Sequence, residues 1–356
     1  MDGLKPIKVL IVAPAPPLIG GQTVQARKLI EKFRSEPGIE AALLPINPSF
    51  LPLLQRIKYL RTILTSFRFV IGLLATIPRY DVVHIFSASY FSFLLAPFPS
   101  LLVAKLFGKK TILNYRSGEA EDHLSRWRSA LPIIKRFDRV VVPSGYLVEV
   151  FAKFGIVAES VFNFVDKDKY QFRERHPLRP IFLSNRNFEK LYNVGLVLEA
   201  FAKIREKHLD AKLILAGDGE EKGSLRSRAE ELGLENVEFV GRISPEAMPR
   251  LLNRADIYLN SPNIDNMPNS IIEAFAAGLP VVSTNAGGIP YICDDGRTAL
   301  LVETGDAEGI AAKALRLLED GELARKMIAE AHRECQKYSW ENVREDWLRI
   351  YKELAR

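Results

Sequence analysis

The most informative segment of this chain is residues 265–290, DNMPNSIIEAFAAGLPVVSTNAGGIP. A short helix is expected at Ile271–Ala277, and a Gly-Leu-Pro break at 278–280 ends it. An apolar strand at Val281–Thr284 and a paired-glycine loop at Gly287 and Gly288 follow. A helix that leads directly into a fully apolar strand is typical of a parallel α/β sheet.

Two carboxylates, Asp265 and Glu273, flank the start of this helix. The free backbone N–H groups at a helix N-terminus favour an anion such as a phosphate, and the nearby carboxylates suit ribose and sugar hydroxyls. The segment therefore predicts a nucleotide-sugar site. Its turn consists of Met267, Pro268, Asn269 and Ser270.

Strand-length apolar runs alternate with helical patterns along the whole chain, so we predict an α/β fold with two doubly wound, Rossmann-like domains. The strands expected in the first half are Lys8–Ala13, Val82–Ser87, Thr111–Tyr115 and Val140–Pro143. Those expected in the second half are Ile181–Ser184, Lys212–Ala216, Val237–Val240, Ile257–Asn260, Val281–Thr284 and Ala299–Val302.

A length of 356 residues is enough for two domains. The charged, proline-containing stretch 162–180 is the expected join between them. We therefore predict an N-terminal domain at 1–166 and a C-terminal domain at 175–338. A last helix at about 340–356 has Trp347, Ile350 and Leu354 at helical spacing.

Residues 265–290 resemble the motif of two carboxylates eight positions apart in the retaining glycosyltransferases of family 4 (glycosyl transferases group 1). Further similar segments follow in the family's order: KVLIVAP with Gly20-Gly21, TILNYRSGEAEDH, SNRNFEK, LAGDGEE and VEFVGRIS. The resemblance implies the GT-B fold, in which two domains face a cleft and the last helix crosses back to the first domain.

This resemblance also implies an activity. The enzyme would move a sugar, with retention, from a nucleoside-diphosphate-sugar to a saccharide or polyprenyl-linked acceptor in cell-envelope or polysaccharide biosynthesis. It would use no metal and no cofactor. We expect UDP rather than GDP as the carrier nucleotide.

Arg186 and Lys190 follow a predicted strand end and stand four residues apart. Cleavage of a nucleotide-sugar leaves negative charge on a diphosphate, and two fixed cations there stabilise the transition state more than the ground state. The family contains this Arg-x-x-x-Lys pair. An isolated pair of this kind would be only a solvated loop.

The resemblance assigns roles to the two carboxylates. Glu273 would accept hydrogen bonds from the ribose hydroxyls, and Asp265 would face the donor sugar. The family more often has Glu at the outer position, so Asp265 is one methylene shorter. Alternatively, Glu273 simply stabilises the N-terminus of its own helix.

Other donor-binding positions lie in loops that follow predicted strands. Glycine lets a backbone approach a ligand closely, and the family places Gly20 and Gly21 against the diphosphate or the acceptor. Gly217 and Asp218 resemble the loop near the base and ribose, and Arg242 resembles the position beside the nucleobase. Each loop is equally compatible with an ordinary turn.

Arg116 is the main departure from the family, which usually has His at this position. Arginine stays protonated and cannot act as a general base. The residue would bind a charged sugar or an acceptor phosphate, or it marks a weakened enzyme. His123, seven residues later, either lies near Arg116 or, as we expect, is an ordinary surface residue.

Residues 1–180 contain 26 Lys and Arg against 14 Asp and Glu, whereas the remainder has 23 against 29. A basic half indicates a negatively charged partner, and the absence of any recognised nucleic-acid module argues against nucleic acid. Only two cysteines and no visible signal peptide are typical of a cytoplasmic protein. The Asp166-Lys167-Asp168 triplet lies in the expected join, so we interpret it as unrelated to metal.

Two apolar stretches raise the question of a membrane. Residues 82–104 contain no charge except that of His84, but Pro97 and Pro99 favour a strand plus a buried helix over a span. Residues 53–79 carry apolar side chains at helical spacing together with five of the basic residues, with no carboxylate. This stretch is either a domain helix packed on the sheet or a peripheral contact with an anionic membrane on its inner face.

Two other functions remain open. A GT-B sugar phosphorylase would use free phosphate at Arg186 and Lys190. A nucleotide-sugar-binding protein that has lost turnover would explain Arg116 and Asp265.

Overall fold

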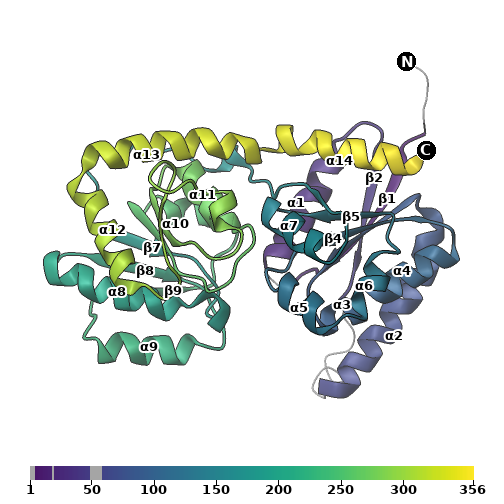
Figure 1. Ribbon diagram of the computed structural model, residues 1–356, viewed down its shortest axis with the longest axis horizontal. Helices are drawn as coiled ribbons and strands as arrows, with labels where there is room; N and C mark the ends of the chain where they lie inside the picture. Colours follow the sequence, from purple (N-terminus) through teal and green to yellow (C-terminus); the bar gives the residue numbers. More distant parts are fainter. Residues whose placement is uncertain (1–4, 18–19, 49–57) are drawn as a thin grey trace. The chain divides into compact units, whose positions relative to one another are not determined.

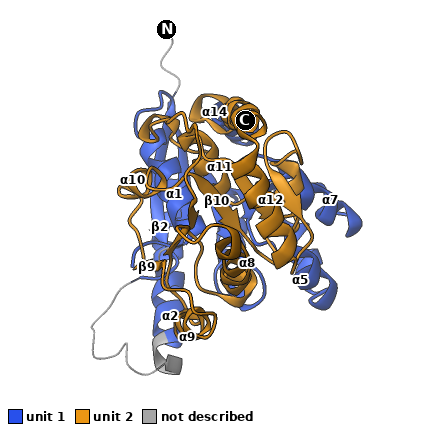
Figure 2. Ribbon diagram, turned by 90° about the vertical axis from the view of Figure 1, so that its left-hand side faces the viewer, with its two compact units in different colours: residues 1–163, 343–356 blue, residues 164–342 orange. Residues whose placement is uncertain are grey.

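The computed structural model describes residues 5–17, 20–48 and 58–356. The chain divides into two compact units, which Figure 2 shows in different colours. Unit 1 comprises Met1–Asn163 and Val343–Arg356, and unit 2 comprises Phe164–Asn342. The unit boundary thus falls at the start of the charged stretch 162–180.

Unit 1 contains a six-stranded parallel sheet with the strand order β2-β1-β3-β4-β5-β6. All four strands predicted in this half are present. Two edge strands, β2 and β6, were not predicted, because β2 has only one β-branched residue and β6 only two residues. The bounds are β1 Ile7–Ala13, β2 Ile39–Pro45, β3 Val82–Ser87, β4 Lys110–Tyr115, β5 Arg139–Val142 and β6 Glu159–Ser160.

Helices lie on both sides of this sheet (Figure 1). They are α1 Gly21–Phe33, α2 Lys58–Thr76, α3 Phe91–Leu95, α4 Pro97–Leu106, α5 Ala120–Arg126, α6 Ala130–Ile134 and α7 Gly145–Lys153, with the 3₁₀ turn η2 Ile77–Arg79. The core of the unit is built from the inner strands, and residues Val9 to Ala13 of β1 are fully buried. A strand buried on both faces reads as a continuous apolar run, which is why β1 could be recognised in the sequence.

Unit 2 contains a second six-stranded parallel sheet, ordered β12-β11-β10-β7-β8-β9. All six strands predicted in this half are present. The bounds are β7 Ile181–Ser184, β8 Lys212–Ala216, β9 Val237–Gly241, β10 Ile257–Asn260, β11 Val281–Thr284 and β12 Leu300–Val302. Counted from β7, the order is 3-2-1-4-5-6, the order of dinucleotide-binding domains. The fold class is confirmed.

The helices of unit 2 also cover both faces of its sheet (Figure 1). They are α8 Val194–Lys207, α9 Lys222–Glu231, α10 Met248–Leu252, α11 Asn269–Ala277, α12 Ala307–Glu319 and α13 Gly321–Glu334. The 3₁₀ turns are η3 Lys167–Lys169, η4 Lys190–Tyr192, η5 Ile289–Tyr291 and η6 Cys335–Tyr338.

The last helix, α14 Trp340–Ala355, begins in unit 2, and from Val343 onward it belongs to unit 1. Its Arg344 forms an ion pair with Glu36, with both N···O distances 2.6 Å. Trp347 packs against His84 of β3, with ring centroids 4.6 Å apart. The helix end predicted from Trp347, Ile350 and Leu354 therefore packs onto the first unit.

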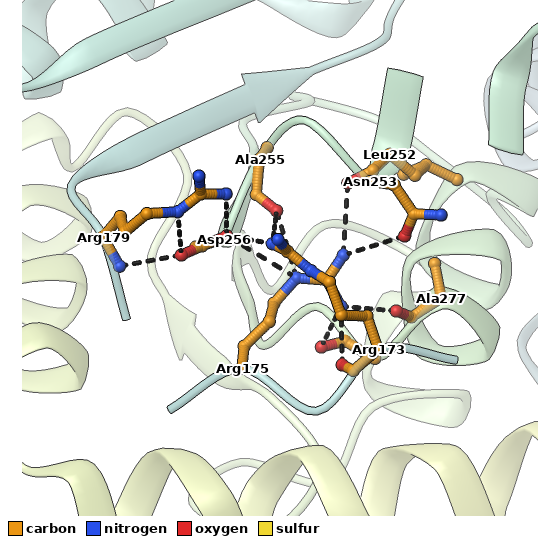
Figure 3. A network of polar contacts seen from close by, with 9 residues as sticks. Arg173, Arg175, Arg179, Leu252, Asn253, Ala255, Asp256 and Ala277 are labelled. Atoms are coloured by element: carbon orange, nitrogen blue, oxygen red, sulfur yellow. Dashed lines mark hydrogen bonds and ion pairs between the residues drawn. The ribbon is translucent and has the colours of Figure 1, made fainter. Parts of the chain in front are cut away.

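A buried carboxylate holds the segment after the unit boundary on unit 2 (Figure 3). Asp256, only 2% exposed, accepts hydrogen bonds from the backbone N and the guanidinium of Arg179 at 2.8 to 3.0 Å and pairs with Arg173. Burial alone would raise the pKa of Asp256, but the bonds from Arg179 and the arginine charges outweigh it and lower that pKa. Residues 173–179 are thus an integral part of unit 2.

Arg175 completes the same network (Figure 3). Its buried guanidinium donates to the carbonyl oxygens of Ala255 at 3.0 Å and Gly278 at 2.9 Å, and also to Ala277 and Leu252. Leu252, Ala277 and Gly278 lie at the C-terminal ends of α10 and α11, where carbonyl groups lack partners within the helix, and Ala255 lies three residues beyond α10. The arginine therefore joins the ends of two helices to the segment that precedes β7.

The apolar stretch 82–104 forms β3 followed by α3 and α4, as the strand-plus-helix interpretation predicted. The second apolar stretch departs from the packed-helix interpretation. Although Phe69 and Leu73 of α2 are buried, Phe67 is 67% exposed, and Ile71 and Leu74 also face outward. Residues 53–57 lie outside the described part of the chain.

Candidate functional site

The strand order of unit 2 reverses direction between β7 and β10, which pair in parallel. In doubly wound sheets, ligands bind at such a switch point, beyond the carboxyl ends of the strands. Arg186 follows the end of β7, and Asp265 follows the end of β10. The topology thus brings together two residues that are 79 positions apart in sequence.

Arg186 and Asp265 form an ion pair at this point, with an N···O distance of 2.5 Å. The same guanidinium donates to Ser270 Oγ at 3.0 Å and lies over the Tyr192 ring, 4.1 Å from its centroid. Burial alone would lower the pKa of Arg186, but the Asp265 carboxylate together with Tyr192 and Tyr258 outweighs it, so that pKa is raised. Asp265, the predicted outer carboxylate, and Arg186, the predicted phosphate-binding cation, therefore form an ion pair at the start of α11.

Lys190 lies in the turn η4, one step farther along the same loop. Its backbone carbonyl accepts from Asn193 N, at 3.3 Å, and from Asn263 Nδ2, at 3.4 Å. The side chain is exposed, and its ammonium forms no hydrogen bond or ion pair within the described part of the chain. This cation is available to a ligand.

The turn before α11 is held by the paired-glycine loop. The carboxylate of Asp265 accepts from Asn266 N at 2.8 Å, and its carbonyl oxygen accepts from Gly288 N at 3.0 Å. A Cβ on Gly288 would lie 1.9 Å from the Asn266 carbonyl oxygen, so glycine is required for this packing. Met267 and Pro268 are buried in the turn.

Helix α11 begins at Asn269, and its first turn contains no acidic residue. Asn269 is half-buried and Ser270 is buried. Because Arg186 donates to Ser270, the cation is held at the N-terminus of the helix, where the helix dipole also places positive partial charge. All these groups attract anions.

Glu273 is buried in α11, with 9% of its surface exposed. The Tyr170 hydroxyl donates to it, and burial together with the Glu273 charge raises the pKa of Tyr170. Sequence reasoning missed Tyr170, which lies in the stretch expected to be a linker. No local pattern marks a lone tyrosine in a charged stretch as the partner of a carboxylate 103 residues later.

Gly217 and Gly219 position the Arg186 loop. A Cβ on Gly217 would lie 2.1 Å from the Arg186 carbonyl oxygen, and one on Gly219 would lie 2.3 Å from that of Phe188. Phe188 N also donates to the Asp218 carbonyl oxygen at 3.1 Å. These glycines allow two loops at the carboxyl edge of the sheet to pack backbone against backbone.

The side chains predicted beside the nucleobase lie on the surface of unit 2. The Asp218 carboxylate pairs with Lys222, with an N···O distance of 3.4 Å. The charge and the hydrogen bond of Lys222, with smaller effects from the Gly219 backbone N–H and the charge of Arg242, lower the pKa of Asp218. Arg242 is exposed.

In unit 1, three loops meet at the carboxyl edge of the sheet. The Ser87 carbonyl oxygen at the end of β3 accepts from Gln22 Nε2, at 3.3 Å, and from Arg116 N, at 3.1 Å. Gly20 and Gly21 immediately precede Gln22, and a Cβ on either would meet no described atom within 4 Å. Packing within the described chain therefore does not require glycine at these two positions.

His123 is fully buried, so the expectation of a surface residue was wrong. Its Nδ1 lies 2.7 Å from the Tyr115 hydroxyl, and the rings of Tyr90, Phe93 and Trp127 surround it. Burial lowers the pKa of His123 to about 4. The residue belongs to the packing beneath the Arg116 loop.

A hollow of about 630 Å³ lies elsewhere, at the amino ends of β7, β8 and β9. Arg173, Arg179 and Lys212 line it together with Glu238 and Arg254. This edge is opposite the carboxyl ends of the strands, where doubly wound sheets bind ligands. Arg254 and Glu238, moreover, pair with each other, so the hollow is not our candidate site.

In the described part of the chain, no group of three or more His, Cys, Asp or Glu side chains is placed to hold a metal ion. Asp166 of the Asp-x-Asp triplet pairs with Lys169, with an N···O distance of 3.1 Å.

The two units together have the GT-B glycosyltransferase fold. Sucrose-phosphate synthase from Thermosynechococcus elongatus superimposes with a TM-score of 0.83, at 18% identity over 98% of this chain and 99% of the other. The Anabaena protein HepE in complex with UDP-glucose superimposes with a TM-score of 0.78, at 16% identity over 98% of this chain and 100% of the other.

Residues 166–334 match the family of glycosyl transferases group 1. The matched residues all lie in the second unit. Among curated proteins, the N-acetyl-alpha-D-glucosaminyl L-malate synthase of Bacillus anthracis is 32% identical over 209 residues, which are 56% of this chain and 54% of that protein. The chain thus spans about half the length of this relative.

Proposed function

We propose that the chain is a retaining glycosyltransferase that takes its sugar from a nucleoside-diphosphate-sugar. The observation that carries this proposal is the pairing of Arg186 with Asp265 at the switch point of a Rossmann-ordered sheet. Lys190, whose ammonium has no partner among the described residues, lies in the same loop as Arg186. The family match and the HepE complex with UDP-glucose support the donor class, with UDP as the carrier.

Unit 2 supplies the groups that hold the donor. Lys190, Arg186 and the N-terminus of α11 attract the diphosphate, and Glu273 accepts hydrogen bonds from the ribose hydroxyls. Asp265, fixed by Arg186, faces the donor sugar. As the bond from the sugar to the phosphate oxygen breaks, negative charge grows on the diphosphate, and the two cations stabilise it without a metal.

The acceptor attacks the sugar from the face that the diphosphate leaves, which gives retention. A new bond forms between the acceptor oxygen and the anomeric carbon, and the acceptor proton passes to the departing phosphate oxygen. No protein base is required, so the presence of Arg116 in place of His is compatible with turnover. Acceptors in cell-envelope or polysaccharide biosynthesis, a saccharide or a polyprenyl-linked saccharide, fit this scheme.

The first test is calorimetric titration with UDP, GDP, ADP and their glucose conjugates, in the presence and absence of EDTA. Binding of one nucleotide with EDTA present, followed by transfer to an acceptor with retained anomeric configuration by NMR, is the expected result. Inversion would refute the retaining mechanism. Binding with neither transfer nor donor hydrolysis would favour the nucleotide-sugar-binding alternative, and phosphate-dependent breakdown of an oligosaccharide would favour the phosphorylase.

We also propose that unit 1 contacts the inner face of an anionic membrane. By length and composition, the described helix stretch Thr62–Arg79 is apolar enough to cross a membrane. Phe69 and Leu73 pack into unit 1, however, which favours a helix that lies in the membrane interface. Helix α4 contacts α2, and its Leu106 is 72% exposed.

The charge of this region matches an anionic surface. Between Glu40 and Glu119 the sequence contains nine Lys and Arg but only one acid, Asp81. Exposed apolar side chains together with cations are the combination that binds amphipathic helices to anionic lipid. A protein with this surface would act at the cytoplasmic face, where polyprenyl-linked acceptors are accessible.

Co-sedimentation with phosphatidylglycerol vesicles tests the membrane contact. Phe67→Glu should abolish binding, because it places a charge at an apolar contact. Leu209→Glu is the matched control, since Leu209 is 76% exposed in unit 2. Equal loss in both variants, or no binding of the wild type at low salt, would refute the contact.

A further inference from the structure

Among the described residues, the groups that hold the Arg116 guanidinium are neutral. This guanidinium donates to Asn114 Oδ1 at 3.3 Å and to Asn163 Oδ1, and it lies over the Phe86 ring at 5.2 Å from the centroid. Two amide oxygens and an aromatic face orient the cation without neutralising it.

No carboxylate in the described part of the chain forms an ion pair with Arg116. By contrast, the buried Arg186 pairs with Asp265, and Arg344 pairs with Glu36. Burial lowers the pKa of Arg116 to about 9, which leaves the group charged at neutral pH. A half-buried cation without a countercharge is unfavourable unless an anionic ligand completes it.

The support behind Arg116 is a chain of hydrogen bonds that reaches the last helix. Arginine only donates, so Asn114 Oδ1 accepts and Asn114 Nδ2 donates to His84 Nε2 at 2.9 Å. The proton of His84 is then on Nδ1, which donates to the Tyr351 hydroxyl oxygen at 2.7 Å. Burial, followed by the charge of Arg116, lowers the pKa of His84 to about 3, so the imidazole stays neutral.

These hydrogen bonds orient Arg116 without cancelling its charge. Every group that positions Arg116, from Tyr351 through His84 to Asn114, is neutral and presents an acceptor toward the cation. An aspartate at position 114 would have the same shape and would neutralise Arg116 internally. The protein instead keeps the full positive charge at the carboxyl end of β4, beside the Ser87 carbonyl shared with Gln22.

We propose that Arg116 recognises an anionic oxygen group, a carboxylate or a phosphate, carried by the acceptor. This inference rests on the proposed glycosyltransferase function and specifies its substrate class. The donor diphosphate already has its own cations, Lys190 and Arg186, in unit 2, whereas Arg116 belongs to unit 1. The planar guanidinium matches the geometry of a carboxylate or phosphate better than an ammonium does.

The test measures the affinity of the whole protein for inorganic phosphate and for acetate while UDP is saturating, so that the donor diphosphate site is filled. Arg116→Gln should weaken the binding of these anions at least about tenfold, and Arg116→Lys should weaken it less. Asn114→Asp should weaken it as much as Arg116→Gln, because the new carboxylate occupies the guanidinium. UDP affinity should remain within about twofold in all variants.

Asn163→Asp is the second isosteric variant and keeps the test valid if Asn114→Asp does not fold. A comparison of UDP-glucuronate with UDP-glucose identifies the source of the anion. Wild type and Arg116→Gln should discriminate equally between these donors. A preference for UDP-glucuronate that disappears in Arg116→Gln would place the anion on the donor sugar and overturn the acceptor assignment.

Two other results would also overturn the proposal. In the first, Arg116→Gln binds phosphate and acetate as tightly as the wild type does. In the second, Arg116→Gln binds UDP tenfold more weakly, while its affinity for phosphate and acetate is unchanged. Arg116-dependent anion binding in a protein that binds no nucleotide diphosphate would instead refute the proposed function and leave the anion site intact.

Discussion

Replacement of Lys190 by alanine should change the rate of sugar transfer and leave the stability of the protein nearly unchanged. The ammonium of Lys190 is exposed and has no partner in the described chain, so its loss should change the free energy of unfolding by no more than about 0.5 kcal/mol. Removal of one positioned charge from a developing anion typically raises the activation barrier by about 3 kcal/mol. Transfer should therefore slow on the order of a hundredfold.

Arg186 does not allow so clean a test. Its removal would leave Asp265 and Ser270 without their partner in a buried environment, which costs about 3 kcal/mol of stability or more. Any loss of activity in Arg186→Ala would then combine unfolding with chemistry.

The assay is release of nucleoside diphosphate under saturating donor and acceptor, with thermal unfolding measured on the same samples. Lys207→Ala is the matched control, because Lys207 is an exposed lysine at the opposite end of α8, about 20 Å along the helix. Near-normal turnover in Lys190→Ala would refute the assigned role. An equal loss in Lys207→Ala would show that net charge, rather than position, is responsible.

Three further results are expected. Gly288→Ala should lower the thermal midpoint and weaken UDP binding, because its Cβ would lie 1.9 Å from the Asn266 carbonyl oxygen, and wild-type values for both would contradict the packing. Asp256→Asn should destabilise by about 2 to 3 kcal/mol in urea unfolding, since it leaves buried guanidinium groups without their carboxylate, and a neutral effect would contradict the network. The pKa values of His84 and His123 are lowered to about 3 and 4 in the folded protein, so below pH 6.5 each imidazole binds fewer protons in the folded than in the unfolded state. The free energy of unfolding should therefore fall as the pH falls, by roughly 2 kcal/mol per histidine between pH 8 and 5. His123→Gln should show a smaller decrease over that range, and an unchanged decrease would exclude His123 as a source.

Much of the fold could be read from local patterns. The inner strands of both sheets are continuous apolar runs, and all ten predicted strands are present within one or two residues at each end. The helix expected at Ile271–Ala277 is also present, as Asn269–Ala277. The edge strand β2 could not be found in this way, because it is only partly buried and its composition is not typical of a strand.

The helix α2 illustrates the limit of periodicity. Apolar residues at helical spacing predict a helix, but they do not say which face of it packs. Phe67, Ile71 and Leu74 follow each other at helical spacing, and yet they are exposed, whereas Phe69 and Leu73 are buried. On a helix that is apolar nearly all round, neighbouring elements choose the face.

Residue types and strand ends are local properties, and they predicted two Rossmann-like units. They located Arg186, Lys190 and Asp265 after the ends of strands and Glu273 in the helix that follows Asp265. Sequence alone could not show that Arg186 pairs with Asp265, that Tyr170 donates to Glu273, or that neutral groups from Tyr351 to Asn114 support Arg116. Except for the contact between Asn114 and Arg116, these contacts join residues 30 to 267 positions apart in the sequence. Strand order and helix docking bring such residues together, so only the tertiary structure determines which cations are neutralised and which remain available to a ligand.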